Sequence, residues 1–164
     1  MTLPEGLESI GEHCFRFTAI KEITIPASVK SIERYAFNGY RKDGNYHRVL
    51  EKVVLQEGLE SIEKECFYDT GLKEIHIPNT VTSIGSLCFK NTYITNIVIP
   101  NSVKKLEDKT FMDCVHLISV TLPSGLESIG EGCFKNTNLK NVTVPNDTHI
   151  ANSAFPNNCE IRRE

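Results

Sequence analysis

A short alternation of apolar and polar residues recurs along the chain and predicts a series of β-strands. Each copy ends in an apolar–x–apolar triplet biased toward Ile and Val, which is typical of a strand with one buried face. A proline follows most copies, and because proline cannot donate a ladder hydrogen bond it marks the end of the strand. The copies are IKEITI at 20–25, LEKVVL at 50–55, LKEIHI at 72–77, ITNIVI at 94–99, LISVTL at 117–122 and LKNVTV at 139–144.

The predicted strands belong to a longer repeat of 22 residues. From Pro4 onward, the proline positions and their one substitute, Gln56, are separated by 22, 30, 22, 22, 23 and 22 residues. A phenylalanine follows 11 residues after almost every one of these positions, so seven of the eight phenylalanines share one column of the repeat. They are Phe15, Phe37, Phe67, Phe89, Phe111, Phe134 and Phe155.

A unit of 22 residues cannot bury its own apolar face, whereas stacked units share one core. No segment has a sustained helical period, so we expect turns or short 3₁₀ pieces between the strands. The pattern therefore predicts a β-rich solenoid of about six to seven coils, with a parallel sheet on one face. The whole of residues 1–164 forms one domain, with an insertion loop at 38–49 and an atypical terminal repeat at 145–164.

The motif L-x-x-I-x-I-P-x-x-V-x-x-I-x-x-x-x-F resembles the BspA-like class of leucine-rich repeats, from Leu3 to about Phe155. The resemblance implies a right-handed solenoid of the α/β leucine-rich-repeat type, whose parallel strands line one face. It also implies a bacterial or protozoan protein of the cell surface or the secreted fraction, involved in adhesion or protein binding and not in catalysis. The first ten residues lack the basic and apolar regions of a signal peptide, so none is expected within this chain.

Composition and charge narrow the classes of partner. With 40% hydrophobic and 24% charged residues, the chain has the composition of a folded, soluble protein. The net charge of −3 gives no electrostatic basis for binding nucleic acid. No apolar run approaches the roughly 20 residues of a membrane helix, so direct membrane insertion is not expected. We expect a monomer.

The cysteines and the His13–Cys14 pair are the residues that could suggest chemistry. Four of the six cysteines, at 14, 66, 88 and 133, share a repeat slot with alanine and threonine, which predicts small buried thiols. A disulfide between Cys66 and Cys88 on adjacent coils is the open alternative. The slot of His13 also accepts Tyr, Glu, Leu, Lys and Gly, and serine recurs in a column of its own, whereas a nucleophile is needed once. We therefore expect no catalytic, metal-binding or cofactor-binding residues, and no cofactor.

Two places are candidates for binding a partner. The first is the outward side of the strands, with Thr24, Val54, His76, Val98, Ile118, Thr121 and Thr143. The second is the insertion, a basic and aromatic loop with Tyr40, Arg41, Lys42, Tyr46, His47 and Arg48, because insertions in repeat proteins often carry function. An ordinary solvated sheet and a drifted repeat are the respective alternatives.

These observations favour a non-catalytic module that binds another protein or peptide through the strand face, helped by the loop. A structural spacer that holds other domains apart is one alternative. An intracellular scaffold is another, since free thiols suit a reducing compartment.

Overall fold

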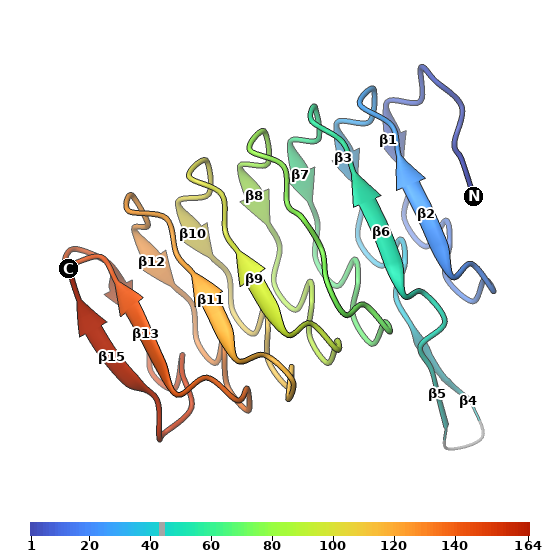
Figure 1. The fold of residues 1–164 in the computed structure, drawn as a ribbon. Coiled ribbons are helices and arrows are strands. Elements are labelled where there is room, and N and C mark those ends of the chain that lie inside the picture. The colour runs from blue at the N-terminus through green and yellow to red at the C-terminus, as the bar shows by residue number, and fades with distance from the viewer. Residues whose placement is uncertain (43–44) are drawn as a thin grey trace.

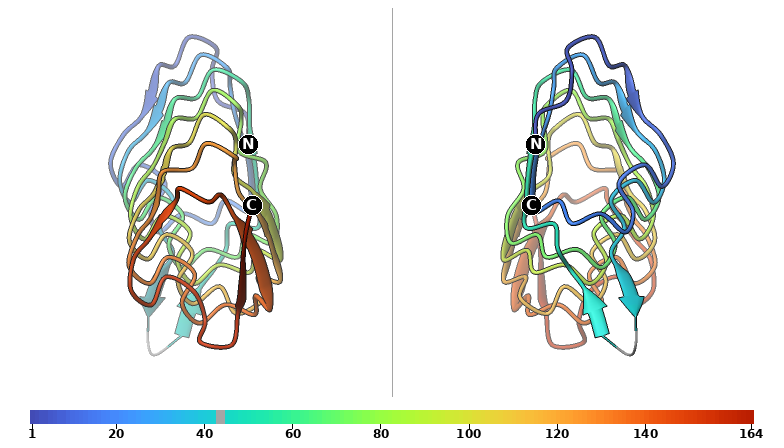
Figure 2. Two further views of the ribbon diagram at one scale, coloured as in Figure 1. Left: turned by 90° about the vertical axis from the view of Figure 1, so that its left-hand side faces the viewer. Right: turned by 90° about the vertical axis from the view of Figure 1, so that its right-hand side faces the viewer.

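The computed structural model describes residues 1–42 and 45–164, and the side chains of residues 41–46 lie outside the described part. The chain forms a stack of coils with its two termini at opposite ends (Figure 1). Seen from either end, successive coils follow a similar path, each displaced from the one before (Figure 2). The predicted repeat solenoid is confirmed. The described residues contain no helical or 3₁₀ segment, and turns take the place of the short helical pieces that were allowed for.

The predicted strands form one side of the solenoid, which we call the strand face. They pair in parallel and in register, as β2 with β6, β9 with β11 and β13 with β15. The terminal repeat adds β15, which the sequence pattern did not indicate. The strands are β2 (Glu22–Ile25), β6 (Lys52–Leu55), β9 (Asn96–Val98), β11 (Ser119–Thr121), β13 (Asn141–Val144) and β15 (Glu160–Arg163).

The segment 72–77 differs from its predicted state, because it runs along the strand face without forming a strand. The predicted alternation of buried and exposed side chains is nevertheless present, since Ile75 and Ile77 are buried while Glu74 and His76 are exposed. In the described part of the chain, the one backbone hydrogen bond between residues 73–77 and the neighbouring coils runs from Thr95 N–H to Lys73 O, at 3.2 Å. Apolar burial fixes which side faces the core, but it does not fix the spacing that ladder pairing needs.

A second ladder lies on the opposite side of the coils (Figures 1 and 2). Strands of two residues each form a four-stranded and a three-stranded parallel sheet. The recurring serines therefore lie in strands whose backbones pair between successive coils. Strands this short leave no alternation to recognise, and the sequence pattern did not indicate them. They are β1 (Ser9–Ile10), β3 (Ser31–Ile32), β7 (Ser61–Ile62), β8 (Ser83–Ile84), β10 (Lys105–Leu106), β12 (Ser128–Ile129) and β14 (His149–Ile150).

The core is built from the repeat columns, and the phenylalanine column forms a continuous ring stack. Adjacent ring centroids lie between 5.0 and 5.5 Å apart, with the ring planes within 10° of parallel. Phe67, Phe89, Phe111 and Phe134 are fully buried. In-register stacking of coils therefore buries the apolar side chains that one coil alone would leave exposed.

The cysteines that precede the column phenylalanines are buried in the inner coils and exposed in the first coil. Cys66, Cys88 and Cys133 are fully buried, and all six cysteines are free thiols. Burial raises the pKa of Cys66, Cys88 and Cys133, because the thiolate loses its hydration. Cys14 departs from the prediction: it lies on the outermost coil and is exposed.

Each coil turns through residues in the left-handed region of backbone conformation. One such position lies two residues before the column phenylalanine, as in Tyr35 with a φ of 59°. A second lies two residues after it, and there the chain places Phe17, Asp69, Asn91, Asp113 and Asn136, with φ between 57° and 62°. Asn and Asp tolerate this conformation well, whereas a bulky aromatic residue is an outlier there.

The insertion at 38–49 contains an antiparallel hairpin rather than an irregular loop. Its strands are β4 (Tyr40–Lys42) and β5 (Asn45–His47), and it projects from one edge of the solenoid (Figure 1). Tyr40 pairs with His47 across the hairpin, and their rings stack at 4.6 Å with 3° between the planes. Gly39 precedes the hairpin because a Cβ atom there would lie 1.9 Å from the carbonyl oxygen of Asp69.

Candidate binding surface

The seven candidate residues of the strand face all lie on the same side of the coils, but they differ in exposure. Val98, Ile118 and Val54 are exposed apolar side chains, with 62%, 57% and 41% of their surface accessible. His76, Thr121 and Thr143 are also exposed, whereas Thr24 is half-buried. The ladder register places Val98 beside Thr121 and Thr24 beside Val54.

Four of these residues, Val54, His76, Val98 and Thr121, line one groove of about 440 Å³, which we call the strand-face groove. Ile118, Thr121 and Thr143 line a smaller hollow of about 270 Å³ farther along the stack. The candidate residues therefore form two neighbouring depressions on one face, and Thr24 lines neither of them. The other side chains exposed in the strand-face groove are Lys52, Glu74, Asn96 and Ser119.

The strand-face groove lies where the ladder is interrupted. β6 pairs with β2 and β9 pairs with β11, so both of these strands are hydrogen-bonded away from residues 74–77. His76 stands between the ridges carrying Val54 and Val98. The missing strand pairing and the hollow thus coincide on the same coil.

The groove combines apolar and charged side chains. It presents apolar methyl groups, one ammonium group, one carboxylate and one imidazole, which suits an apolar side chain flanked by polar contacts. Within the described residues, no three His, Cys, Asp or Glu side chains are grouped closely enough to hold a metal ion. The described part of the chain also contains no helix with the length and apolar character needed to span a membrane.

Within the insertion, the candidate residues do not share one role. Tyr40 and His47 are half-buried and stack on each other, as described above. The side chains of Arg41, Lys42 and Tyr46 lie outside the described residues. Arg48 turns inward: its side chain is 15% exposed, and Nη2 lies 3.9 Å from Oδ1 of Asp69.

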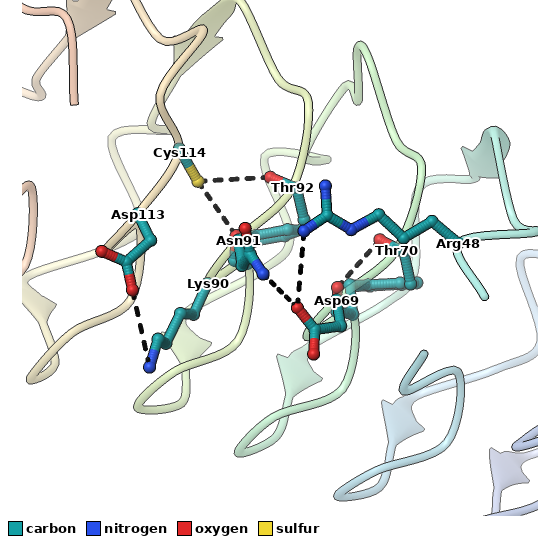
Figure 3. A network of polar contacts seen from close by, with 10 residues as sticks. Arg48, Asp69, Thr70, Lys90, Asn91, Thr92, Asp113 and Cys114 are labelled. Carbon is teal, nitrogen blue, oxygen red and sulfur yellow. Dashed lines mark hydrogen bonds and ion pairs between the residues drawn. The ribbon is translucent and has the colours of Figure 1, made fainter. Parts of the chain in front are cut away.

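A polar network anchors Arg48 and the base of the hairpin to the next coils (Figure 3). Its guanidinium lies 4.7 Å from the ring centre of Tyr93, and Asn91 Nδ2 donates a hydrogen bond to Oδ1 of Asp69. Burial raises the pKa of Asp69, while the hydrogen bond from Asn91 and the charge of Arg48 oppose that rise. Farther along, Lys90 pairs with Asp113 at 3.6 Å. The network places Arg48 in a structural role at the hairpin base.

The repeat pattern matches the family described as the BspA type leucine rich repeat region, in six copies that span residues 1–43 and 45–162. The chain belongs to this family. The resemblance drawn from the Pro and Phe positions is thereby confirmed.

Solved structures of bacterial leucine-rich repeat proteins share the fold. A leucine-rich repeat protein from T. pallidum is 26% identical, with a TM-score of 0.71 over 98% of this chain and 71% of its own. Proteins from Eubacterium ventriosum and Bacteroides ovatus are 29% and 19% identical, with TM-scores of 0.55 and 0.54. This chain spans 44% and 59% of those two proteins. A search of curated protein sequences found no significant match.

Two residues of this BspA-type solenoid that sequence reasoning passed over, Arg16 and Phe17, lie beside the hairpin. Phe17 is 60% exposed and meets the Tyr40 ring edge-on at 4.8 Å. The Arg16 guanidinium lies 4.5 Å from the centre of the Phe17 ring. A signal was available, because Phe17 is the one phenylalanine of the eight outside the repeat column.

Proposed function

We propose that this BspA-type solenoid is a non-catalytic interaction module that binds another protein or peptide through the strand-face groove. The observation that carries the proposal is the pair of exposed valines, Val54 and Val98, on either side of His76 in a hollow of about 440 Å³. Exposed apolar side chains gathered in one depression and rimmed by polar groups are typical of protein interaction sites.

The charges around the groove support a peptide or protein as the partner. Lys52 and Glu74 line the groove together with the two valines, so the site offers both signs of charge next to an apolar surface. A partner segment with one apolar anchor and polar neighbours fits that arrangement. Recognition of this kind needs no chemical step.

We further propose a location at the cell surface or in the secreted fraction, in line with the family, and adhesion as the wider role. A surface adhesin needs a stable scaffold that displays a broad binding face, and a stacked solenoid provides one. Immunolabelling of intact against permeabilised source cells tests the location. Labelling of intact cells is expected, and labelling confined to permeabilised cells would overturn the surface assignment.

The binding proposal is tested by selecting peptides on the intact chain from a displayed library and measuring their affinities in solution. Val98→Lys should weaken binding at least tenfold, because the ammonium group replaces the apolar contact. Val115→Lys is the matched control, since Val115 is equally exposed at 56% but does not line the groove. If Val98→Lys leaves every affinity unchanged, or if both variants weaken binding equally, the groove is not the binding site.

A further inference from the structure

We infer that Arg16, Phe17, Tyr40 and His47 form a second binding site, for an acidic peptide segment of a partner protein that carries an apolar side chain. These four residues are called the edge platform below. The site lies at the base of the projecting hairpin, on the edge of the solenoid rather than on the strand face (Figure 1). It is independent of the strand-face groove, and neither proposal requires the other.

The first observation is that Phe17 is exposed in an unfavourable conformation. Its φ is 62°, in the left-handed region, where the equivalent positions of later coils carry Asp69, Asn91, Asp113 and Asn136. Those residue types adopt this conformation at lower cost than an aromatic residue does. The Phe17 side chain is 60% exposed, so its burial does not offset the conformational free-energy cost. Residues held in sparsely populated backbone conformations tend to cluster at functional sites.

The second observation is an unsatisfied donor on the adjacent residue. Nε of Arg16 is buried and has no hydrogen-bond acceptor among the described residues. The guanidinium group instead lies over the Phe17 ring. A buried N–H without a partner is uncommon in folded proteins and calls for an acceptor. Two unfavourable features thus occur on consecutive residues, next to the one insertion in the repeat.

The third observation is the aromatic surface that surrounds these two residues. Phe17 meets the Tyr40 ring edge-on, and Tyr40 stacks on His47, so three rings adjoin one another. The same three rings, together with Phe15, contribute to the wall of a pit of about 20 Å³. That volume matches a single small group. The Arg48 network holds the hairpin base in place, so the platform is preformed (Figure 3).

Charge decides the kind of partner. Arg16 makes no ion pair in the described part of the chain. The sequence of the insertion contains Arg41, Lys42 and Arg48 but only one acidic residue, so this region is basic although the whole chain has a net charge of −3. Carboxylates and phosphates are the acceptors that pair with a guanidinium group through two parallel hydrogen bonds. A nucleic acid would need a track of several cations along its phosphates. Arg48 is already turned inward, so an acidic segment fits the edge platform better.

The test uses the intact chain on an array of blocked 12-residue peptides in four classes: acidic–apolar, acidic–polar, basic–apolar and uncharged–apolar. The acidic–apolar class should be enriched, and its best members should bind saturably in solution. Arg16→Gln and Phe17→Asn should each weaken that binding at least tenfold. Asn occupies the Phe17 position in two other coils, so Phe17→Asn should leave the melting temperature unchanged or raise it.

Two control variants keep the test specific. Arg162→Gln removes an exposed arginine on the last strand, and Val98→Lys alters the strand-face groove. Both should bind the acidic–apolar peptides within twofold of the unmodified chain. The proposal is overturned if no acidic–apolar peptide binds, if Arg16→Gln and Phe17→Asn bind as well as the controls, or if a ten-nucleotide oligothymidylate binds the platform more tightly than the peptides.

Discussion

The Phe89 ring stacks on the Phe111 ring, with 5.3 Å between the ring centroids and 9° between the ring planes. Both rings are fully buried, and each belongs to a different coil. The contact therefore joins neighbouring repeats, and the same contact recurs along the stack. Stability of the solenoid should depend on these contacts between coils more than on any single coil.

Replacing one ring in the middle of the column should destabilise several coils together. Phe89→Ala should lower the free energy of unfolding by about 3–5 kcal/mol, because it removes buried apolar surface and leaves a cavity. Denaturant unfolding followed by circular dichroism measures the change. Val115→Ala, at an exposed position, is the control and should change stability by less than about 0.5 kcal/mol. Similar small effects for both variants would contradict the stacked-column account.

The thiols should differ in reactivity according to burial. In the native protein, Cys14 should react rapidly with a thiol reagent, whereas Cys66, Cys88 and Cys133 should react only after unfolding. Their burial blocks access, and it raises their pKa so that little thiolate forms. A timed thiol titration with and without denaturant checks this. Cys14→Ser should remove one thiol from the native-state reaction and leave only the half-buried Cys159, and a native-state reaction of unchanged amplitude would refute the assignment.

Asp69 should make a pH-dependent contribution to stability. The pKa of Asp69 in the folded chain is raised from the model-compound value of 3.8, because burial disfavours the carboxylate. An acid with a raised folded-state pKa stabilises the fold when protonated. This contribution is present below the unfolded-state pKa and is lost as the pH rises through the folded-state value.

The measurement compares the unfolding free energy of the unmodified chain with that of Asp69→Asn across the acidic range. The variant keeps an acceptor for Asn91 but does not titrate. As the pH falls, the unmodified chain should gain stability relative to the variant, since the other carboxylates are common to both. A relative loss of stability on acidification would mean that Asp69 is stabilised as the charged form.

Much of the fold could be predicted from the sequence, because its columns are repeated. The Pro, Ile and Phe positions gave the strands, the core and the coil length without any long-range information. The two-residue strands were missed because Ser–Ile pairs have no period to detect, and 72–77 was predicted as a strand because side-chain alternation reports burial rather than pairing. The strand-face candidates lie on one side of the coils, but the grouping of four of them into a groove depends on that missing pairing.

Side-chain contacts of individual residues were harder to predict from the sequence than the fold. Sequence reasoning placed His13 among the tolerant turn positions, and the structure stacks it on Tyr35 with 4.9 Å between ring centroids. It also grouped Arg48 with the binding loop, although burial against Asp69 and Tyr93 turns this residue inward. Phe17 stood out in the sequence as the one phenylalanine outside the repeat column, but its contacts with Arg16 and Tyr40 leave no periodic signal and became visible only in three dimensions.

Amide hydrogen exchange at residues 74–77 tests the account most directly, with and without a peptide selected on the chain. Because these amides donate no backbone hydrogen bond among the described residues, they should exchange much faster than the paired amides of β6 and β9 in the free protein. A peptide in the strand-face groove should slow exchange at Glu74, Ile75 and His76. Slow exchange of these amides in the free protein, or peptide-induced protection confined to the opposite ladder, would contradict it.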